Sequence, residues 1–334
     1  MLDRIDSYEL EITSDCNAAC PACDRTNFKM PLRGNKNITI EDIKSIFYSK
    51  DLIDGVDFLF SGVLGDPIVN PDCYDICKYL TENGAKIVIN TNGGYNNVKF
   101  WSKMGELDNL CVDFATDGGP DTNHLYRINV KWEVLYRNMK AYSDAGGTGR
   151  CVFIEFDHNK QDRDFIENLA NELNFKFRTR VNRDKSFTLD KKDIDKKPIK
   201  QAEEKEEVTI YDVRNLFKQH KDYAEIINQV SSTIRCRHMK EKSLFIGADM
   251  TLWPCCHLYA ASLREDFNSH YPDGYNDLKT KTIREIISSN PFTDISDRWD
   301  AANDFFLPRC VKTCAQGGFR SRSHSENYKK MAEK

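Results

Sequence analysis

Three cysteines near the start of the chain have the spacing of a metal-binding loop. Cys16, Cys20 and Cys23 form the pattern CxxxCxxC directly after the strand-like run 8–13. Three thiolates on one short loop can bind three irons of a cubane cluster and leave the fourth iron without a protein ligand. Zinc is the alternative, although structural zinc sites usually take four ligands from paired units. The spacing and the position after a strand favour a 4Fe-4S cluster.

A second set of cysteines lies in the last third of the chain. Cys236, Cys255, Cys310 and Cys314 can supply four thiolates to another metal centre, and Cys256 or His257 can replace one of them. Four thiolates suit an iron–sulfur cluster and also tetrahedral zinc, so the residues leave both metals open. The 12 cysteines are not those of a disulfide framework, because the chain is long and shows no export signal.

The elements that must position the first loop alternate regularly. Strand-like runs are expected at 8–13, 56–61, 86–91, 110–116, 151–156 and 175–181, with five helical segments between them. Such alternation predicts a parallel sheet with helices outside it. Thr39 is the expected cap of one helix, and Asn70, followed by Pro71, is the expected start of the next. Cys73 and Cys77 share a helix face and, like Cys111 and Cys151 in strand patterns, are expected in the core.

Polar and glycine-rich turns follow the first four strands, where parallel α/β sheets bind ligands. SDCNAAC follows the first strand, SGVLGDP the second, NTNGG the third and TDGGPD the fourth. Glu155, in the run FIEF of the fifth strand, is a candidate cofactor or substrate contact if it points into the barrel.

In this order the motifs resemble the radical S-adenosylmethionine (AdoMet) superfamily over residues 8 to about 181. In that superfamily the turn after the second strand is similar to GGEP, the third strand ends in TNG, and the fourth strand is followed by DG and a distant arginine. The resemblance assigns AdoMet binding to Gly62, Gly65, Asp66, Pro67, Thr91, Asn92, Asp117 and Arg127, with aspartate at position 66 where glutamate is usual.

The resemblance also implies the chemistry. A reducing partner such as flavodoxin or ferredoxin reduces the cluster on Cys16, Cys20 and Cys23, which are then the catalytic ligands. Cleavage of AdoMet gives a 5′-deoxyadenosyl radical that removes hydrogen from a substrate. A peptide or protein substrate is favoured. A small molecule (a sugar, nucleoside or cofactor precursor) is the second interpretation, and a non-catalytic zinc-binding scaffold is the third.

The C-terminal cysteines resemble the SPASM module or its shorter form, twitch, which implies a second, auxiliary 4Fe-4S cluster. Met250 stands where that pattern has glycine, five residues before Cys255. The predicted fold is therefore a partial (β/α)6 TIM-like barrel of the α/β class with a small C-terminal iron–sulfur module. The expected domains are the barrel at 1–183, a charged linker or mobile loop at 184–208, and the module at 209–334.

Composition limits the partners. The formal net charge of -4 does not indicate a general nucleic-acid binder, because no basic excess is available to neutralise phosphates. No run approaches the roughly 20 apolar residues that span a bilayer, so no membrane partner is expected. The expected location is the cytoplasm.

Overall fold

The computed structural model describes residues 4–27, 36–180, 231–262, 274–289, 292–293, 295–299 and 308–315. These residues fall into two compact units. One holds the barrel strands together with residues 244–253, and the other holds the remaining described residues beyond 230. The charged segment 184–208, expected as a linker or mobile loop, lies outside the described residues, so the predicted domain boundaries stay predictions.

A parallel sheet forms the barrel unit. Its six strands are β1 (Ser7–Leu10), β2 (Asp57–Phe60), β3 (Lys86–Thr91), β4 (Leu110–Ala115), β5 (Thr148–Ile154) and β6 (Lys176–Arg180). Each strand pairs in parallel with the next one in the chain. The predicted α/β class with a partial barrel of six parallel strands is confirmed, and all the carboxyl ends of these strands lie at one edge.

The sheet continues past β1 with an antiparallel hairpin, β7 (Ser243–Ile246) and β8 (Leu252–Trp253). The Glu11 N–H donates to the Ile246 carbonyl at 2.9 Å, which ties the hairpin to the chain after β1. Residues 244–253 were expected in the C-terminal module, but they extend the barrel sheet. Met250 lies in the hairpin turn with φ of 67°, a left-handed conformation that favours glycine.

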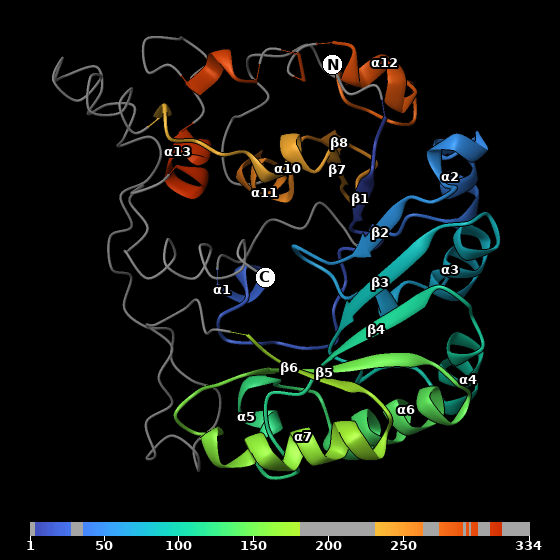
Figure 1. Ribbon diagram of the computed structural model, residues 1–334, viewed down its shortest axis with the longest axis vertical. Coiled ribbons are helices and arrows are strands. Elements are labelled where there is room, and N and C mark those ends of the chain that lie inside the picture. Colours follow the sequence, from blue (N-terminus) through green and yellow to red (C-terminus); the bar gives the residue numbers. More distant parts are fainter. Residues whose placement is uncertain are drawn as a thin grey trace, which may run out of the picture. The chain divides into compact units, whose positions relative to one another are not determined.

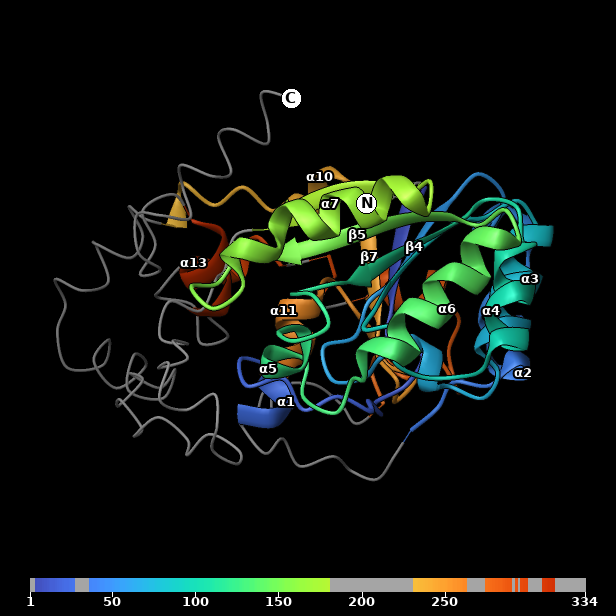
Figure 2. The ribbon, with the colours of Figure 1, turned by 90° about the horizontal axis from the view of Figure 1, so that it is seen from below.

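Five helices connect the strands and line the outer side of the sheet (Figure 1, Figure 2). They are α2 (Ile40–Ile46), α3 (Cys73–Glu82), α4 (Val98–Gly105), α6 (Trp132–Asp144) and α7 (Arg163–Glu172). Trp101 of α4 and Tyr142 of α6 pack on Phe114 of β4 in the core. Cys73 and Cys77 are fully buried on α3, as expected of core residues.

The loops between these elements contain short helical turns. They are the helices α1 (Asp24–Asn27) and α5 (Asn123–Tyr126) and the 3-10 turns Lys50–Leu52, Pro67–Val69 and Lys160–Asp162. The second unit contains α10 (Arg237–Lys240), α11 (Cys256–Ser262), α12 (Ile283–Ile287), the 3-10 turn Asp297–Trp299 and α13 (Pro308–Cys314). Among the described helices, none is long and apolar enough to cross a membrane.

The two predicted helix starts have different outcomes. Thr39 caps α2 and forms a reciprocal capping box with Asp42, as predicted. The start assigned to Asn70 is wrong, because α3 begins at Cys73 with Asp72 as its cap. The buried Asn70 amide instead donates to the carbonyls of Ile12 and Ile38, at 2.5 and 2.9 Å. Asn70 therefore joins two chain segments that approach each other only in the folded barrel.

Candidate active site

The loop after β1 brings Cys16, Cys20 and Cys23 together. The Ala18 N–H donates to the Cys16 sulfur at 3.4 Å. The Arg25 guanidinium donates to the Cys16 carbonyl at 3.1 and 3.2 Å, and the Cys23 N–H donates to the Cys20 carbonyl at 3.1 Å. Cys20 is buried, whereas Cys16 and Cys23 are half-buried. The three thiols are close enough that Cys20 contributes to the raised pKa of Cys16, and Cys23 to that of Cys20.

Burial keeps the thiols of Cys16 and Cys20 neutral until a cation replaces the proton. The pKa of Cys16 is raised to about 12, first by burial and then by the neighbouring Asp66. Burial also raises the pKa of Cys20, against the opposing effect of Arg127. A cationic metal centre would take up the thiolate charge that the protein interior disfavours. The type and burial of the donors therefore fit an iron–sulfur cluster.

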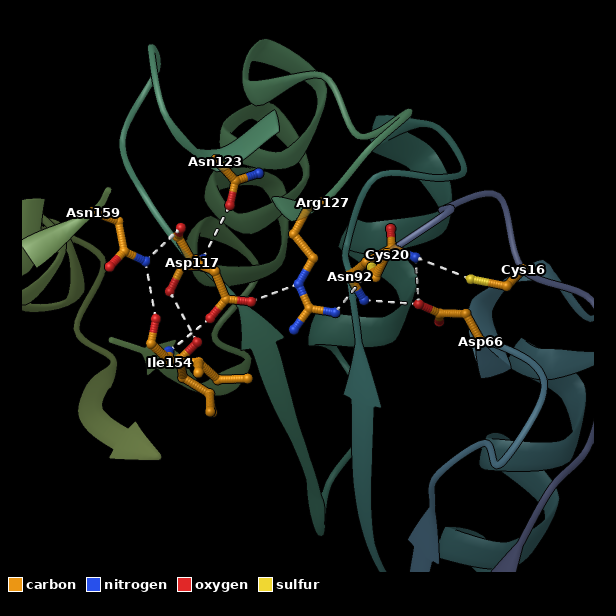
Figure 3. A network of polar contacts seen from close by, with 11 residues as sticks. Cys16, Cys20, Asp66, Asn92, Asp117, Asn123, Arg127, Ile154 and Asn159 are labelled. Carbon is orange, nitrogen blue, oxygen red and sulfur yellow. Dashed lines mark hydrogen bonds and ion pairs between the residues drawn. The ribbon is translucent and has the colours of Figure 1, made fainter. Parts of the chain in front are cut away.

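A carboxylate and an amide support Cys16 from two other strand ends (Figure 3). Asp66, which follows β2 and is buried, accepts from the Asn92 backbone N–H at 2.7 Å and from its side-chain amide at 2.6 Å. The same amide nitrogen lies 3.8 Å from the Cys16 sulfur. The predicted residues Asp66 and Asn92 thus meet at the cluster loop, and the Asp66 carboxylate fixes the direction in which the Asn92 amide points.

Cys20 has a similar support from the end of β4 (Figure 3). Arg127 donates from Nε to the Asp117 carboxylate at 2.6 Å and from Nη1 to the Cys20 sulfur at 3.5 Å. The Asp117 side chain is fully buried, and its second oxygen accepts from the Ile154 N–H at 2.7 Å. The guanidinium therefore brings a positive charge to a thiol ligand in a fixed orientation.

The glycine-rich turn after β2 is held close to the cysteine loop. The Glu11 carboxylate accepts from the backbone N–H groups of Leu64 and Gly65. The Asp66 N–H donates to the Asp15 carbonyl at 2.7 Å. Pro67 begins a 3-10 turn whose Ile68 N–H donates to Asp66. The turn thus packs directly against the loop that contains Cys16.

Close approach explains both glycines of this turn. A Cβ on Gly62 would lie 1.7 Å from the Gly65 carbonyl oxygen, and a Cβ on Gly65 would lie 1.9 Å from that of Thr13. Both neighbours are backbone atoms that cannot rotate away. Local sequence predicts a turn here, but only the fold requires these two positions to lack a side chain.

Gly65→Ala is expected to destabilise the barrel by about 3 kcal/mol or more, because the backbone must separate to admit the methyl group. Urea unfolding followed by circular dichroism measures the change. Gly119→Ala is the matched control, since the nearest neighbours of its Cβ would be side chains in ordinary contact, the Phe165 ring at 3.4 Å and the Asp162 carboxylate at 3.7 Å. Equal stability of the two variants would show that the turn tolerates the extra atom.

The remaining predicted residues are placed differently. Thr91 ends β3, is buried, and accepts from the Gly93 N–H at 3.0 Å. Glu155 was expected within the fifth strand, which is wrong. It follows the end of β5, is exposed, and lies 3.9 Å from Arg163. No contact among the described residues joins Glu155 to the polar groups around the thiols.

Three asparagines of the site were not singled out from the sequence. Asn17, inside the cysteine loop, accepts from the Asn92 amide at 2.9 Å. Asn123 accepts from the Asp117 N–H at 3.0 Å, and Asn159 donates to the Asp117 carbonyl at 2.9 Å (Figure 3). Asn17 is marked by its place between two ligand cysteines. Asn123 and Asn159 carry no local signal, because their role depends on contacts across the fold.

The four C-terminal cysteines are also neighbours of one another. Burial and then Cys310, Cys314 and Cys236 raise the pKa of Cys255. Cys314 and Cys236 likewise raise the pKa of Cys310, and Cys236 that of Cys314. All six pairs therefore interact electrostatically, within one unit of the structure. It is unfavourable to bring thiolates of like charge together, and a metal centre that binds them offsets this repulsion.

Within the described residues, no three His, Cys, Asp or Glu side chains are close enough to share a single metal ion. Both proposed metal sites therefore rest on the spacing of the thiols, their burial and their mutual influence. The metal at each site stays a prediction, as does the exchange of Cys256 or His257 for a ligand.

Comparison with known proteins identifies the barrel. Residues 10–171 match the family model described as the Radical SAM superfamily. The Streptococcus suis protein SuiB, solved with S-adenosylmethionine, superposes with a TM-score of 0.58 at 13% identity, over 88% of this chain and 68% of that one. The AdoMet-bound structure of anSMEcpe gives 0.54 at 12% identity, over 98% and 96%. Residues 10–171 therefore form a Radical SAM domain, and that superfamily is a class of enzymes.

Curated relatives are more distant and cover less. The AdoMet-dependent heme synthase of Nitratidesulfovibrio vulgaris is 24% identical over 45% of this chain and 38% of its own length. A Pyrococcus furiosus protein that modifies the cofactor of a tungsten-containing aldehyde ferredoxin oxidoreductase is 24% identical over 49% of this chain and 47% of its own. This chain thus matches less than half the length of these relatives.

Proposed function

We propose that this chain reductively cleaves S-adenosylmethionine at a 4Fe-4S cluster bound by Cys16, Cys20 and Cys23. The observation that carries the proposal is the pair of supports at the thiols, Asp66–Asn92 at Cys16 and Asp117–Arg127 at Cys20. Side chains that hydrogen-bond to metal ligands in this way orient the ligands and tune the metal. When bound, the cluster and AdoMet supply a 5′-deoxyadenosyl radical that removes hydrogen from the substrate.

In that scheme, the residues of this chain bind and position the cluster and AdoMet. The strand ends and turns after β2, β3 and β4 contribute Gly62, Gly65, Asp66, Pro67, Thr91, Asn92, Asp117 and Arg127 to the AdoMet site. The buried carboxylates of Asp66 and Asp117 hold their donors toward the thiolates. A flavodoxin or ferredoxin is the proposed electron donor, and Cys236, Cys255, Cys310 and Cys314 are the proposed ligands of a second 4Fe-4S cluster.

Anaerobic reconstitution tests the proposal. Protein loaded with iron and sulfide and reduced with dithionite should convert AdoMet to methionine and 5′-deoxyadenosine in equal amounts. Chromatography measures both products, and electron paramagnetic resonance (EPR) should show a cluster signal that changes on addition of AdoMet. Zinc in place of iron after iron-replete anaerobic expression, with no cleavage, would instead support the non-catalytic scaffold.

A peptide or protein is the proposed substrate class. SuiB, which shares the fold over 88% of this chain, was also solved bound to its precursor peptide SuiA. Modification of a small molecule is the second candidate, favoured by the heme synthase and cofactor-modifying relatives. The protein is incubated with pools of peptides and of small molecules, and mass spectrometry identifies the product. The pool in which a modified molecule forms distinguishes the two substrate classes.

Arg127→Gln is expected to lower the reduction potential of the AdoMet-responsive cluster by about 60 mV, because the reduced cluster loses a nearby positive charge. A change of that size corresponds to a tenfold shift in a one-electron equilibrium. Potentiometric EPR titration measures it. Arg137→Gln removes the same charge from an exposed site on α6 and serves as the control. Arg127→Lys should lie between wild type and Arg127→Gln, and identical potentials in all four proteins would exclude the effect.

A further inference from the structure

The inner face of the barrel sheet carries a row of polar side chains away from the thiols. The strand register places Asn90 of β3 beside Asp113 of β4, and Asp113 beside Arg150 of β5. Side chains alternate along a strand, and the adjacent Phe114 packs on Trp101 of the outer helices. Asn90, Asp113 and Arg150 therefore point to the opposite side, into the barrel.

Two arginines share the single carboxylate of this row. Arg150 donates from Nε to Asp113, whose side chain is only 3% exposed. Arg180, at the end of β6, reaches across the face, so that its Nη2 lies 3.5 Å from Asp113 and 3.4 Å from the Asn90 side-chain oxygen. The row thus holds two guanidinium groups against one carboxylate.

Hydrogen-bonding capacity is left over at the same place. Arg150 uses Nε for Asp113, and its two terminal nitrogens have no hydrogen-bond partner in the described part of the chain. The Arg150 side chain is 28% exposed, so these groups are accessible. Arg178, two residues before Arg180 and on the same strand face, is exposed and forms no ion pair with any described residue. Arg150 thus offers cationic donors that no described residue satisfies.

The row lies two residues along the chain from a residue that contacts the cysteine loop. Asn90 of β3 precedes Asn92, which directly follows this strand, by two residues, or about 7 Å of extended chain. The Asn92 amide lies 3.8 Å from the Cys16 sulfur. A molecule bound to Arg150 and Arg180 could therefore extend within the barrel toward the residues around that sulfur.

We propose that Arg150 and Arg180 bind an anionic group of the substrate, a carboxylate or a phosphate. Guanidinium nitrogens match the geometry of both groups, and the partly desolvated interior strengthens the attraction. The inference rests on the proposed function, in which the substrate enters the barrel. It narrows that substrate to a molecule or peptide with an anionic group a short distance from the carbon that loses hydrogen.

Anion binding can be measured without knowing the substrate. Thermal unfolding of the cluster-loaded protein is followed with sodium malonate or inorganic phosphate, against sodium chloride at equal ionic strength. Wild type and Arg137→Gln should be stabilised in a saturable way, and Arg150→Gln and Arg180→Gln should bind at least fivefold more weakly. Stabilisation by malonate alone identifies a carboxylate, and by phosphate alone a phosphate.

Two results would overturn the inference. One is the absence of any stabilisation of the wild type by either anion at tens of millimolar. The other is equal stabilisation of wild type, Arg150→Gln and Arg180→Gln. Arg180 is 43% exposed, so its variant keeps the test valid if Arg150→Gln fails to fold. Release of 5′-deoxyadenosine by the wild type is assayed separately, so that failure of the proposed cleavage and failure of anion binding are told apart.

Discussion

Replacement of Cys16, Cys20 and Cys23 together by alanine is expected to reduce 5′-deoxyadenosine release below detection. The open iron exists only while the protein binds the other three, and the other described thiols of the barrel unit lie within α3, β4 and β5. Chromatography of reactions with dithionite and AdoMet measures the loss. The EPR change on AdoMet addition should disappear with it.

A single cysteine elsewhere in the barrel provides the control. Cys111 lies in β4 and is half-buried, and Cys111→Ala should keep both the cluster and the cleavage. If the triple variant still released 5′-deoxyadenosine at the wild-type rate, the assignment of the cluster to this loop would be wrong. Circular dichroism shows whether each variant is folded, since loss of the barrel would also abolish activity.

Replacement of Cys236, Cys255, Cys310 and Cys314 by alanine is expected to halve the bound iron, from about eight to about four atoms per chain. The four thiols interact with one another and lie on three segments of the chain, so a shared metal is a reason for them to meet. Four protein ligands leave no iron open to AdoMet. Cleavage of AdoMet should therefore persist, while turnover of the true substrate or solubility is lost.

The complementary protein tests the same site. The triple variant at Cys16, Cys20 and Cys23 should retain about four irons per chain in the C-terminal set. Cys256→Ala should leave the iron content unchanged unless Cys256 replaces one of the four. Zinc at this site after anaerobic, iron-replete expression would contradict the second cluster, and the proposed cluster on the first loop would be unaffected.

Local signals in the sequence were sufficient to predict most strands and helices of the barrel. The alternation of strands and helices depends on residue periodicity, which each segment carries alone, and all six predicted strands are present. The capping box of Thr39 and Asp42 involves positions three residues apart, so the sequence alone also predicts it. Asn70 was misread because its side chain bonds to carbonyls 58 and 32 residues away.

The sequence by itself determined the elements, the cysteine loop and the polar turns at the strand ends. Tertiary structure alone decided which of these residues act together. Asp66 pairs with Asn92 and Asp117 is held by Asn159 because parallel strands bring their carboxyl ends to one edge, whatever the separation along the chain. The same register joins Arg150 and Arg180 on one carboxylate, which spacing within any single strand does not encode.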